Sequence, residues 1–257
     1  MEAEERTASQ GAERVMPYDA SRPKGEQVEE MFDSIAPAYD FMNGAMTFGM
    51  HVKWRDKALK LVSESFATTP NEIIDLATGT GDVAFALSHR FPESRVTGCD
   101  LSAGMLRKAE QKRDSLDASQ AERLTFEQGD CLNLKYGDNS FQLATIAYGI
   151  RNFENLEKGL AEIYRILMPG GRLMILELSY PRNLFLRAGY NLYTKLLIPL
   201  AGRLASGDNR AYAYLPESIK AMPPREEIKK MMEGVGFKNV ETRTMTMGVV
   251  TIYTAEK

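Results

Sequence analysis

The chain has 257 residues, of which 44% are hydrophobic, so it is long enough to bury one full core and short for two. Its 32 basic and 35 acidic residues leave a net charge of −3, which excludes the chain-wide cationic field of a nucleic-acid-binding protein. The two cysteines, Cys99 and Cys131, are too few for a disulfide framework, and their spacing does not suit a structural metal.

The first residues are charged and rich in small side chains. We expect residues 1–27 to form a flexible arm, because they bury too little apolar surface to offset the entropy of ordering. They also lack the apolar core of a signal peptide, and no stretch reaches the ~20 apolar residues that cross a bilayer. The sequence therefore predicts a cytoplasmic protein, which still leaves room for peripheral contact with the cytoplasmic face of a membrane.

A helical lid is predicted over residues 28–66, at the start of a single domain that runs to the end of the chain. Apolar residues at helical spacing predict a helix over 27–36, which Pro37 interrupts. An aromatic-rich loop is expected over 38–50, followed by a second helix over 50–65.

The next part of the chain, residues 70–180, alternates short apolar runs with helical patterns. This alternation is typical of βαβ units and predicts a three-layer α/β fold around a parallel sheet. The expected strands are 72–77, 95–100, 124–128, 141–147 and 172–178. The expected helices lie near 82–91, 103–115 and 155–167, the last ended by Pro169 and the two glycines after it.

A second lid is predicted over residues 183–224. Its first part, 183–204, is a strongly apolar helical pattern with three cationic residues, and Pro199 is expected to kink it. This composition suits an isoprenoid tail and shallow membrane contact, with a core helix or a homodimer interface as the alternatives. The remaining stretch, 225–257, predicts a helix over 225–235 and a hairpin of strands 238–245 and 249–255.

The most informative short motif is Gly79-Thr80-Gly81, which follows an apolar strand and opens a helix. Glycines let the backbone turn sharply and approach a ligand closely, and the N–H groups of the next helix are free to donate. Asp100 ends the next strand about twenty residues later, where a carboxylate accepts hydrogen bonds from both hydroxyls of a ribose. The two features together predict an adenosine-type ligand.

An NAD-dependent dehydrogenase would share this turn and carboxylate, and Ala84 even completes its GxGxxA pattern. Three features favour another class. The motif begins near residue 72, Gly129-Asp130-Cys131 follows the third strand where an adenine amine is read, and the last two strands form a hairpin.

These features resemble the class I S-adenosylmethionine methyltransferases over residues 70–257. The resemblance implies a Rossmann-like, mostly parallel seven-stranded sheet with an antiparallel C-terminal strand. It also implies S-adenosylmethionine as the cofactor. The residues that would hold it are Asp75 beneath the turn, Gly79, Thr80 and Gly81 at the methionine part, Asp100 at the ribose, Asp130 and Cys131 at the adenine, and Ala147 beside the cofactor.

Three longer runs carry a more specific resemblance. They are EQVEEMFDSIAPAYDFMNGAMTFGMHVKWRD (26–56), YGIRNFENLEKGLAEIYRILMPGGRLMILELSYP (148–181) and AYAYLPESIKAMPP (211–224). They resemble the quinone-biosynthesis C-methyltransferases of the demethylmenaquinone and polyprenyl-benzoquinol type. This implies carbon methylation of a polyprenyl quinol. The first candidate acceptor is demethylmenaquinol and the second is a benzoquinol. The non-enzyme alternative is a non-catalytic cofactor-binding scaffold. Thr47 departs from a serine common in that family but keeps the hydroxyl.

Such chemistry needs an ionised quinol, because the phenolate pushes electron density onto the neighbouring ring carbon. Phenol pKa values lie near ~10, so a cation or a base must favour the phenolate. We expect Arg151 to supply the charge and Asp82 to take the proton through a water, with His51 as another base and no metal. The structural alternatives are an Arg151–Glu154 ion pair and an Asp82 helix cap. The side chains expected to contact the quinol are Tyr39, Asn43 and Tyr148.

Overall fold

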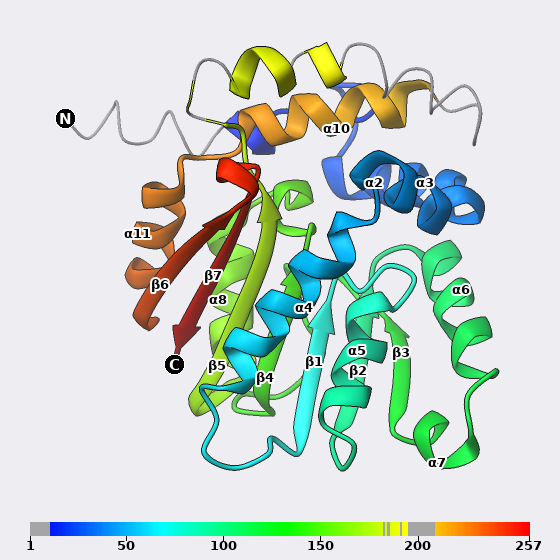
Figure 1. Cartoon of the computed structure of the whole chain (residues 1–257), viewed down its shortest axis with the longest axis vertical. Coiled ribbons are helices and arrows are strands. Elements are labelled where there is room, and N and C mark those ends of the chain that lie inside the picture. The colour runs from blue at the N-terminus through cyan, green and yellow to red at the C-terminus, as the bar shows by residue number, and fades with distance from the viewer. Residues whose placement is uncertain (1–10, 182, 184–185, 191, 195–208) are drawn as a thin grey trace.

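Seven strands form one sheet in the order β3-β2-β1-β4-β5-β7-β6 (Figure 1). The computed structural model describes residues 11–181, 183, 186–190, 192–194 and 209–257. Neighbouring strands are parallel from β3 to β5, whereas β7 is antiparallel to both β5 and β6, as the sequence predicts. The strands are β1 (Glu72–Leu76), β2 (Arg95–Asp100), β3 (Leu124–Gln128), β4 (Phe141–Ala147), β5 (Leu167–Leu178), β6 (Lys238–Met245) and β7 (Val250–Glu256).

The start of β5 is the main difference from the predicted strands. The strand begins at Leu167, which pairs with Phe141 of β4, and the ladder is then shifted before it resumes at Arg172. Gly170 has a φ of +76°, a conformation that costs glycine little. Pro169 and the two glycines therefore form an irregular first part of the strand, rather than a separate turn before it.

Helices cover both faces of the sheet and make two apolar cores. On one face pack α4 (Met50–Ser63), α5 (Asp82–Arg90) and α6 (Ala103–Arg113), and on the other pack α8 (Leu156–Ile166) and α11 (Arg225–Val235). The short elements are α7 (Ala118–Ala121), η2 (Ile150–Asn152) and η3 (Thr246–Gly248), the last joining the two strands of the C-terminal hairpin. This is the predicted three-layer arrangement.

A helical cap lies beyond the carboxyl ends of the parallel strands (Figure 1). It consists of α2 (Lys24–Ile35), η1 (Ala36–Ala38), α3 (Tyr39–Thr47) and α10 (Asn209–Ala221). The loop predicted over 38–50 is wrong, because α3 occupies most of it. Pro37 stands at the start of η1, where a missing N–H costs nothing, so the proline begins a new turn of helix instead of a loop.

The flexible arm predicted over residues 1–27 is also wrong where the chain is described. Lys24 and Gln27 are fully buried. The Lys24 ammonium donates to the carbonyl of Ala12 at 2.6 Å, and the Gln27 carboxamide accepts from the backbone of Tyr18 and Asp19. The segment is held by paired polar groups, which an argument from apolar composition does not count. Residues 1–10 lie outside the described residues.

Most of the apolar segment predicted over 183–204, including Pro199, lies outside the described residues. Tyr190 and Tyr193, which are described, line a cavity beneath the cap. Among the residues that the structure describes, no helix is long and apolar enough to cross a membrane.

Candidate active site

The order of the strands reverses beside β1, since the chain runs from β1 outward to β3 and then returns to β4 on the other side. Ligands of such sheets bind at this reversal, beyond the carboxyl ends of the strands. Ala77, after β1, and Tyr148, after β4, both have a left-handed backbone, with φ of +49° and +58°. Backbone strain of this kind gathers at functional sites. A Cβ on Gly149 would lie 2.7 Å from the Cβ of Ala77, so the two turns touch.

Two cavities adjoin these turns. The large cavity has a volume of about 540 Å³ and the small cavity about 100 Å³. Six residues line both: Phe32, Tyr39, Ala77, Gly79, Ala147 and Tyr148. The two spaces therefore meet at the ends of β1 and β4, where a group bound in one can reach a group bound in the other.

The glycine turn is supported from below by Asp75. This buried carboxylate accepts hydrogen bonds from the hydroxyls of Thr78 at 2.5 Å and Thr145 at 2.7 Å. Burial raises the pKa of Asp75 to about 7, although both hydroxyls and the backbone of Ala84 in α5 oppose the rise. Asp75 thus supports the turn and the start of the helix at once.

The residues of the turn itself have different positions. Gly79 and Thr80 line the large cavity, but Gly81 lines neither. Gly81 has a φ of +85°, and a Cβ there would lie 2.8 Å from the Phe85 ring, so this glycine is needed for the shape of the turn.

Asp100 is a buried carboxylate in the wall of the small cavity. One oxygen accepts the N–H of Gly79 at 2.7 Å and the other accepts the N–H of Ser102 at 2.9 Å. Burial raises the pKa of Asp100, against the effect of these backbone donors. A carboxylate has about four acceptor positions, so these backbone donors do not use all of them and a ligand hydroxyl can still be accepted. This fits the ribose of an adenosine-type cofactor.

The residues expected at the adenine lie in the same wall. Asp130 is exposed, and one of its oxygens accepts the N–H of Leu132 at 2.8 Å. Cys131 is buried, and burial raises the pKa of its thiol, so it packs as a neutral group. Among the described residues, no group of three His, Cys, Asp or Glu side chains is arranged to hold a metal ion.

Two residues that sequence reasoning missed connect the cap to this wall. Asp33 of α2 accepts hydrogen bonds from the Ser102 hydroxyl at 2.5 Å and the Gly104 N–H at 2.7 Å. Lys112 of α6 binds Asp40 of α3 at 2.8 Å. Neither side chain gives a signal in the sequence, because a charged residue on an amphipathic helix usually faces water.

Lys112 also determines the surroundings of Asp82. Its ammonium lies 2.9 Å from one Asp82 oxygen and 3.0 Å from the Thr80 hydroxyl. Burial alone would lower the pKa of Lys112, but Asp40 and Asp82 outweigh it and raise the pKa. The other Asp82 oxygen lies 3.4 Å from Arg55. Asp82 is the first residue of α5 and does not cap it, since the N-cap is Gly81 and no side chain caps the helix.

Arg151 lies in η2 and its side chain forms part of the wall of the large cavity. It is 6% exposed, and it binds a Glu177 oxygen at 3.0 Å and the Tyr148 carbonyl. Its partner is therefore Glu177 and not Glu154. The buried Nε has no hydrogen-bond partner among the described residues. Glu177 stands in the apolar run of β5, and such a charge inside a buried strand is a signal that a partner must exist.

Four polar residues, three from α3 and one from the start of α4, lie four positions apart and all line the large cavity. They are Tyr39, Asn43, Thr47 and His51. The Asn43 side chain bonds the Tyr39 hydroxyl. The Thr47 hydroxyl lies 2.6 Å from the Asn43 carbonyl and 2.7 Å from Nδ1 of His51. Tyr148 faces the same cavity, and within the described part of the chain its buried hydroxyl has no partner.

Comparison with known proteins gives one family. Residues 20–257 match the sequence profile of the ubiE/COQ5 methyltransferase family. The demethylmenaquinone methyltransferase of Porphyromonas gingivalis is 47% identical over 95% of this chain and 98% of that protein. The protein named ubiquinone/menaquinone biosynthesis C-methyltransferase UbiE in Geotalea daltonii is 42% identical over 91% of this chain and 97% of that protein.

Solved structures share the fold at low sequence identity. The [4+2]-cyclase SpnF aligns over 91% of this chain and 96% of its own, with a TM-score of 0.64 and 15% identity. A SAM-dependent methyltransferase of Thermotoga maritima aligns over 89% and 99%, with a TM-score of 0.60 and 18% identity. Phosphoethanolamine N-methyltransferase 2 of Haemonchus contortus, in complex with S-adenosyl-L-methionine, aligns over 79% and 52%, with a TM-score of 0.57 and 17% identity.

Proposed function

The chain belongs to the ubiE/COQ5 methyltransferase family. We propose that it transfers a methyl group from S-adenosylmethionine to a ring carbon of a polyprenyl quinol, and that the preferred acceptor is demethylmenaquinol. The observation that carries the proposal is the junction of the two cavities. A small cavity with a ribose-type carboxylate meets a large cavity whose wall holds a buried arginine with an unused donor.

The cofactor half of the proposal rests on the small cavity and the glycine turn. Asp100 would accept the ribose hydroxyls, Asp130 and Cys131 would border the adenine, and Gly79 and Thr80 would face the methionine part. When bound there, S-adenosylmethionine supplies an electrophilic methyl group on a sulfonium. Ala147 lines both cavities, at the point where this methyl would meet its acceptor. Holding two reactants in line supplies several kcal/mol of rate enhancement.

The acceptor half rests on the large cavity. Most of its lining is apolar and aromatic, including Phe32, Met42 and Tyr190, which suits a naphthoquinol ring and the first units of a prenyl tail. Tyr39, Asn43 and Tyr148 would contact the ring. An apolar wall also excludes water, which strengthens every charge interaction with the bound quinol.

Arg151 would stabilise the phenolate. Its guanidinium stays protonated at any relevant pH, and Glu177 and Tyr148 leave part of its donor set free. Two groups compete for the proton that the quinol loses. Both Asp82 oxygens are held by cations, so a water-mediated transfer to Asp82 competes with two ion pairs. His51 is not ion-paired in this way, and burial lowers its pKa, so its imidazole is neutral at pH 7 and able to take a proton.

A benzoquinol of ubiquinone synthesis is the second acceptor in the proposal. The name of the Geotalea daltonii relative includes both quinones, and the apolar wall of the large cavity suits either ring. Methyl transfer to a quinol would exclude the two alternative hypotheses, an NAD-dependent dehydrogenase and a non-catalytic scaffold.

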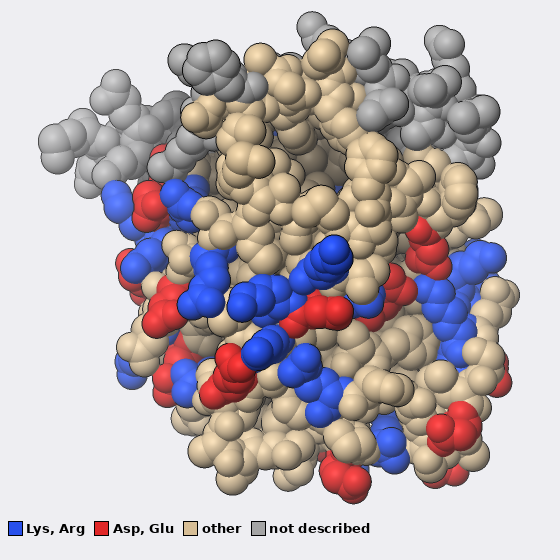
Figure 2. Space-filling model, viewed as in Figure 1, with Lys and Arg blue, Asp and Glu red and all other residues tan. Residues whose placement is uncertain are grey.

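The proposal includes peripheral membrane contact through an apolar rim formed by Phe41, Phe48 and Met247. These side chains are 73%, 77% and 76% exposed, and the last two line the large cavity. Phe48 and Met247 both have a left-handed backbone, so strained turns hold large apolar groups in the open. Figure 2 shows charged side chains gathered below this end of the molecule, while most of the described surface above them is uncharged.

Flotation with phosphatidylcholine vesicles tests the rim. Replacing Phe41, Phe48 and Met247 by serine should lower the floating fraction. Phe41→Ser alone should also lower it without a change in turnover of a short-chain quinol, because Phe41 does not line the large cavity. A homodimer through the same rim would instead appear as a change in sedimentation of the free protein, and flotation unchanged by the three replacements would contradict membrane contact.

The function itself is tested by methyl transfer from labelled S-adenosylmethionine to a reduced short-chain demethylmenaquinol, with the benzoquinol and the oxidised quinone alongside. Label is expected in the reduced naphthoquinol and none in the oxidised quinone, which has no hydroxyl to ionise. Label in both reduced quinols would indicate a step shared by two pathways. No transfer to any reduced quinol by protein that still binds the cofactor would overturn the proposal.

A further inference from the structure

The contacts of Thr47 determine which nitrogen of His51 carries a proton. The Thr47 hydroxyl lies 2.6 Å from the backbone carbonyl of Asn43, and a carbonyl only accepts. The single hydroxyl proton must therefore point at that carbonyl. The same oxygen lies 2.7 Å from Nδ1 of His51, so Nδ1 must donate to it. Neutral His51 consequently has its proton on Nδ1 and a lone pair on Nε2.

We propose that Thr47 is a positioning residue that holds His51 in this tautomer, so that Nε2 takes the hydroxyl proton of the acceptor bound in the large cavity. The proposal rests on the function proposed above. In the step, the quinol O–H bond breaks, its electron pair stays on the phenolate oxygen, and the proton forms a new N–H bond at Nε2. His51 becomes an imidazolium. After methyl transfer the ring carbon loses its hydrogen as a proton to solvent, which restores the aromatic phenolate, and His51 returns its own proton to the phenolate oxygen.

The surroundings of His51 suit a base that works near neutral pH. Burial lowers its pKa, and so does the charge of Arg55, which lies on α4 with it. Asp82 of α5 and Asp40 of α3 act in the opposite direction. The carboxylates stabilise the imidazolium when it forms, while burial keeps the resting ring neutral. His51 and Arg151 line the same cavity, so a base and a cation face one bound ring.

The break between α3 and α4 explains how one hydroxyl can meet both groups. Thr47 is the last residue of α3, and Phe48 and Gly49 turn the chain through left-handed conformations, with φ of 50° and 72°, into α4. His51 is therefore in the first turn of a new helix, and its ring reaches back to the end of the previous one. The Thr47 hydroxyl also lies 3.5 Å from the His51 N–H.

The chain offers a direct test because its only other histidine, His89, is exposed on α5. In untagged His89→Gln protein, ¹⁵N spectra of labelled histidine report His51 alone. We expect a pyrrole-type Nδ1 and a pyridine-type Nε2 in this background. Thr47→Val, which keeps the size and removes the acceptor, should give a mixture of tautomers, and Thr47→Ser should restore the single form. The opposite tautomer in the His89→Gln background would overturn the proposal, whether or not the protein methylates a quinol.

Kinetics then test the role of this tautomer. His51→Gln should lower kcat by about 10²–10⁴-fold, the usual contribution of a general base. Thr47→Val should lower kcat by about five- to tenfold, the value of one neutral hydrogen bond, and Thr47→Ser should recover it. The acid limb of the pH profile should move to lower pH in Thr47→Val, because the imidazolium loses its acceptor. Unchanged kcat and an unchanged acid limb in both Thr47→Val and His51→Gln would contradict the proposal.

Discussion

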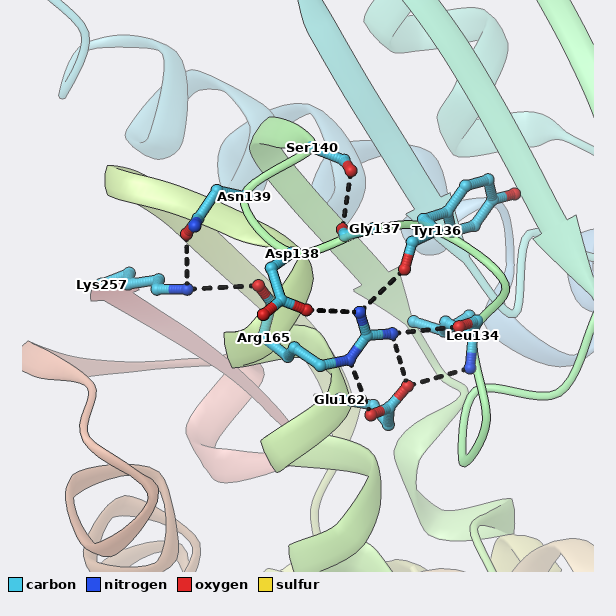
Figure 3. A network of polar contacts seen from close by, with 9 residues as sticks. All are labelled: Leu134, Tyr136, Gly137, Asp138, Asn139, Ser140, Glu162, Arg165 and Lys257. Atoms are coloured by element: carbon cyan, nitrogen blue, oxygen red, sulfur yellow. Dashed lines mark hydrogen bonds and ion pairs between the residues drawn. The ribbon is translucent and has the colours of Figure 1, made fainter.

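Arg151 and Arg165 both bind a glutamate, yet the two arginines differ in how much of their hydrogen-bonding capacity is used. Arg165, at the end of α8, donates through all five of its N–H groups (Figure 3). Its acceptors are both oxygens of Glu162, one oxygen of Asp138 and the carbonyls of Leu134 and Tyr136. Arg151 has two acceptors and a buried Nε with none among the described residues.

The location of each arginine explains this difference. Arg165 is partly exposed, and it joins the end of α8 to the loop before β4. The backbone carbonyl of Arg165 also accepts a hydrogen bond from the Lys257 ammonium, so the residue after β7 is held at the end of α8 as well. Arg151 instead lies in the wall of the large cavity. A saturated arginine holds a fold together, whereas a buried arginine with a spare donor is available to a ligand.

The largest expected effect follows from replacing Arg151. Arg151→Gln should lower kcat for quinol methylation by about 10²–10³-fold, because the charge that stabilises the phenolate is lost. Cofactor affinity, measured by calorimetry, should be unchanged. Glu177→Gln on the Arg151→Gln background removes the unpaired buried carboxylate and should restore stability but not turnover. Full turnover in Arg151→Gln would contradict the claim that Arg151, unlike Arg165, acts on a ligand.

Asp100 should give the next largest effect, on binding instead of catalysis. Asp100→Asn replaces a charged acceptor by a neutral one, so the Kd for S-adenosylmethionine should rise by about 10–100-fold. With saturating cofactor, kcat should stay within a few-fold of the original value. An unchanged Kd would mean that the ribose is not held by this carboxylate.

Arg165→Met is the matched replacement at the saturated arginine. It should lower the free energy of unfolding by about 2 kcal/mol, mainly through the two carbonyls that lose their donors. The corresponding fall in Tm is roughly 4–8 °C. Methyl transfer below the transition should be unaffected. A loss of kcat comparable to that of Arg151→Gln, at equal stability, would show that donor saturation does not separate structural from functional arginines here.

Asp75 should affect the pH dependence of stability. Its pKa is about 7 in the folded protein and near ~3.9 in the unfolded chain. A raised folded pKa means a contribution to stability that is complete below the unfolded value and is lost as pH rises to about 7. Asp75→Asn should therefore lose less stability than the original protein between pH 4 and pH 8, as measured by urea unfolding. Parallel pH curves for the two proteins would contradict the raised pKa.

Much of the fold is predictable because its core strands are distinctive. β2, β3 and β4 have the bounds that the sequence predicts, since short apolar runs between turn residues leave little choice. The helix α3 escapes prediction because a proline usually ends a helix, whereas Pro37 stands at the start of η1, which leads directly into α3. The buried Lys24 escapes prediction because a lysine gives no sign in the sequence that three carbonyls surround it.

The candidate site also contains residues that the sequence indicates and residues that only the structure reveals. Gly79, Thr80 and Asp100 are candidates from the sequence alone, because a strand, a turn and a helix that are contiguous in sequence can form a ligand-binding unit by themselves, and each of the three lines at least one of the two cavities. Glu177 could not be assigned to Arg151, which is 26 residues away, without knowing that the end of β5 lies beside η2. Lys112 and Asp33 likewise depend on how α6 meets the cap. Local chemistry was predictable, and contacts between elements were not.

The phenolate role of Arg151 is tested most directly by measuring the ionisation of a bound phenol. 1-Naphthol absorbs differently in its neutral and ionised forms, so its pKa can be titrated in the presence of saturating protein and S-adenosylhomocysteine. We expect the pKa of bound naphthol to lie below its value in water, and to rise again in Arg151→Gln. A bound pKa equal to or above the value in water, or one that Arg151→Gln leaves unchanged, would contradict the account.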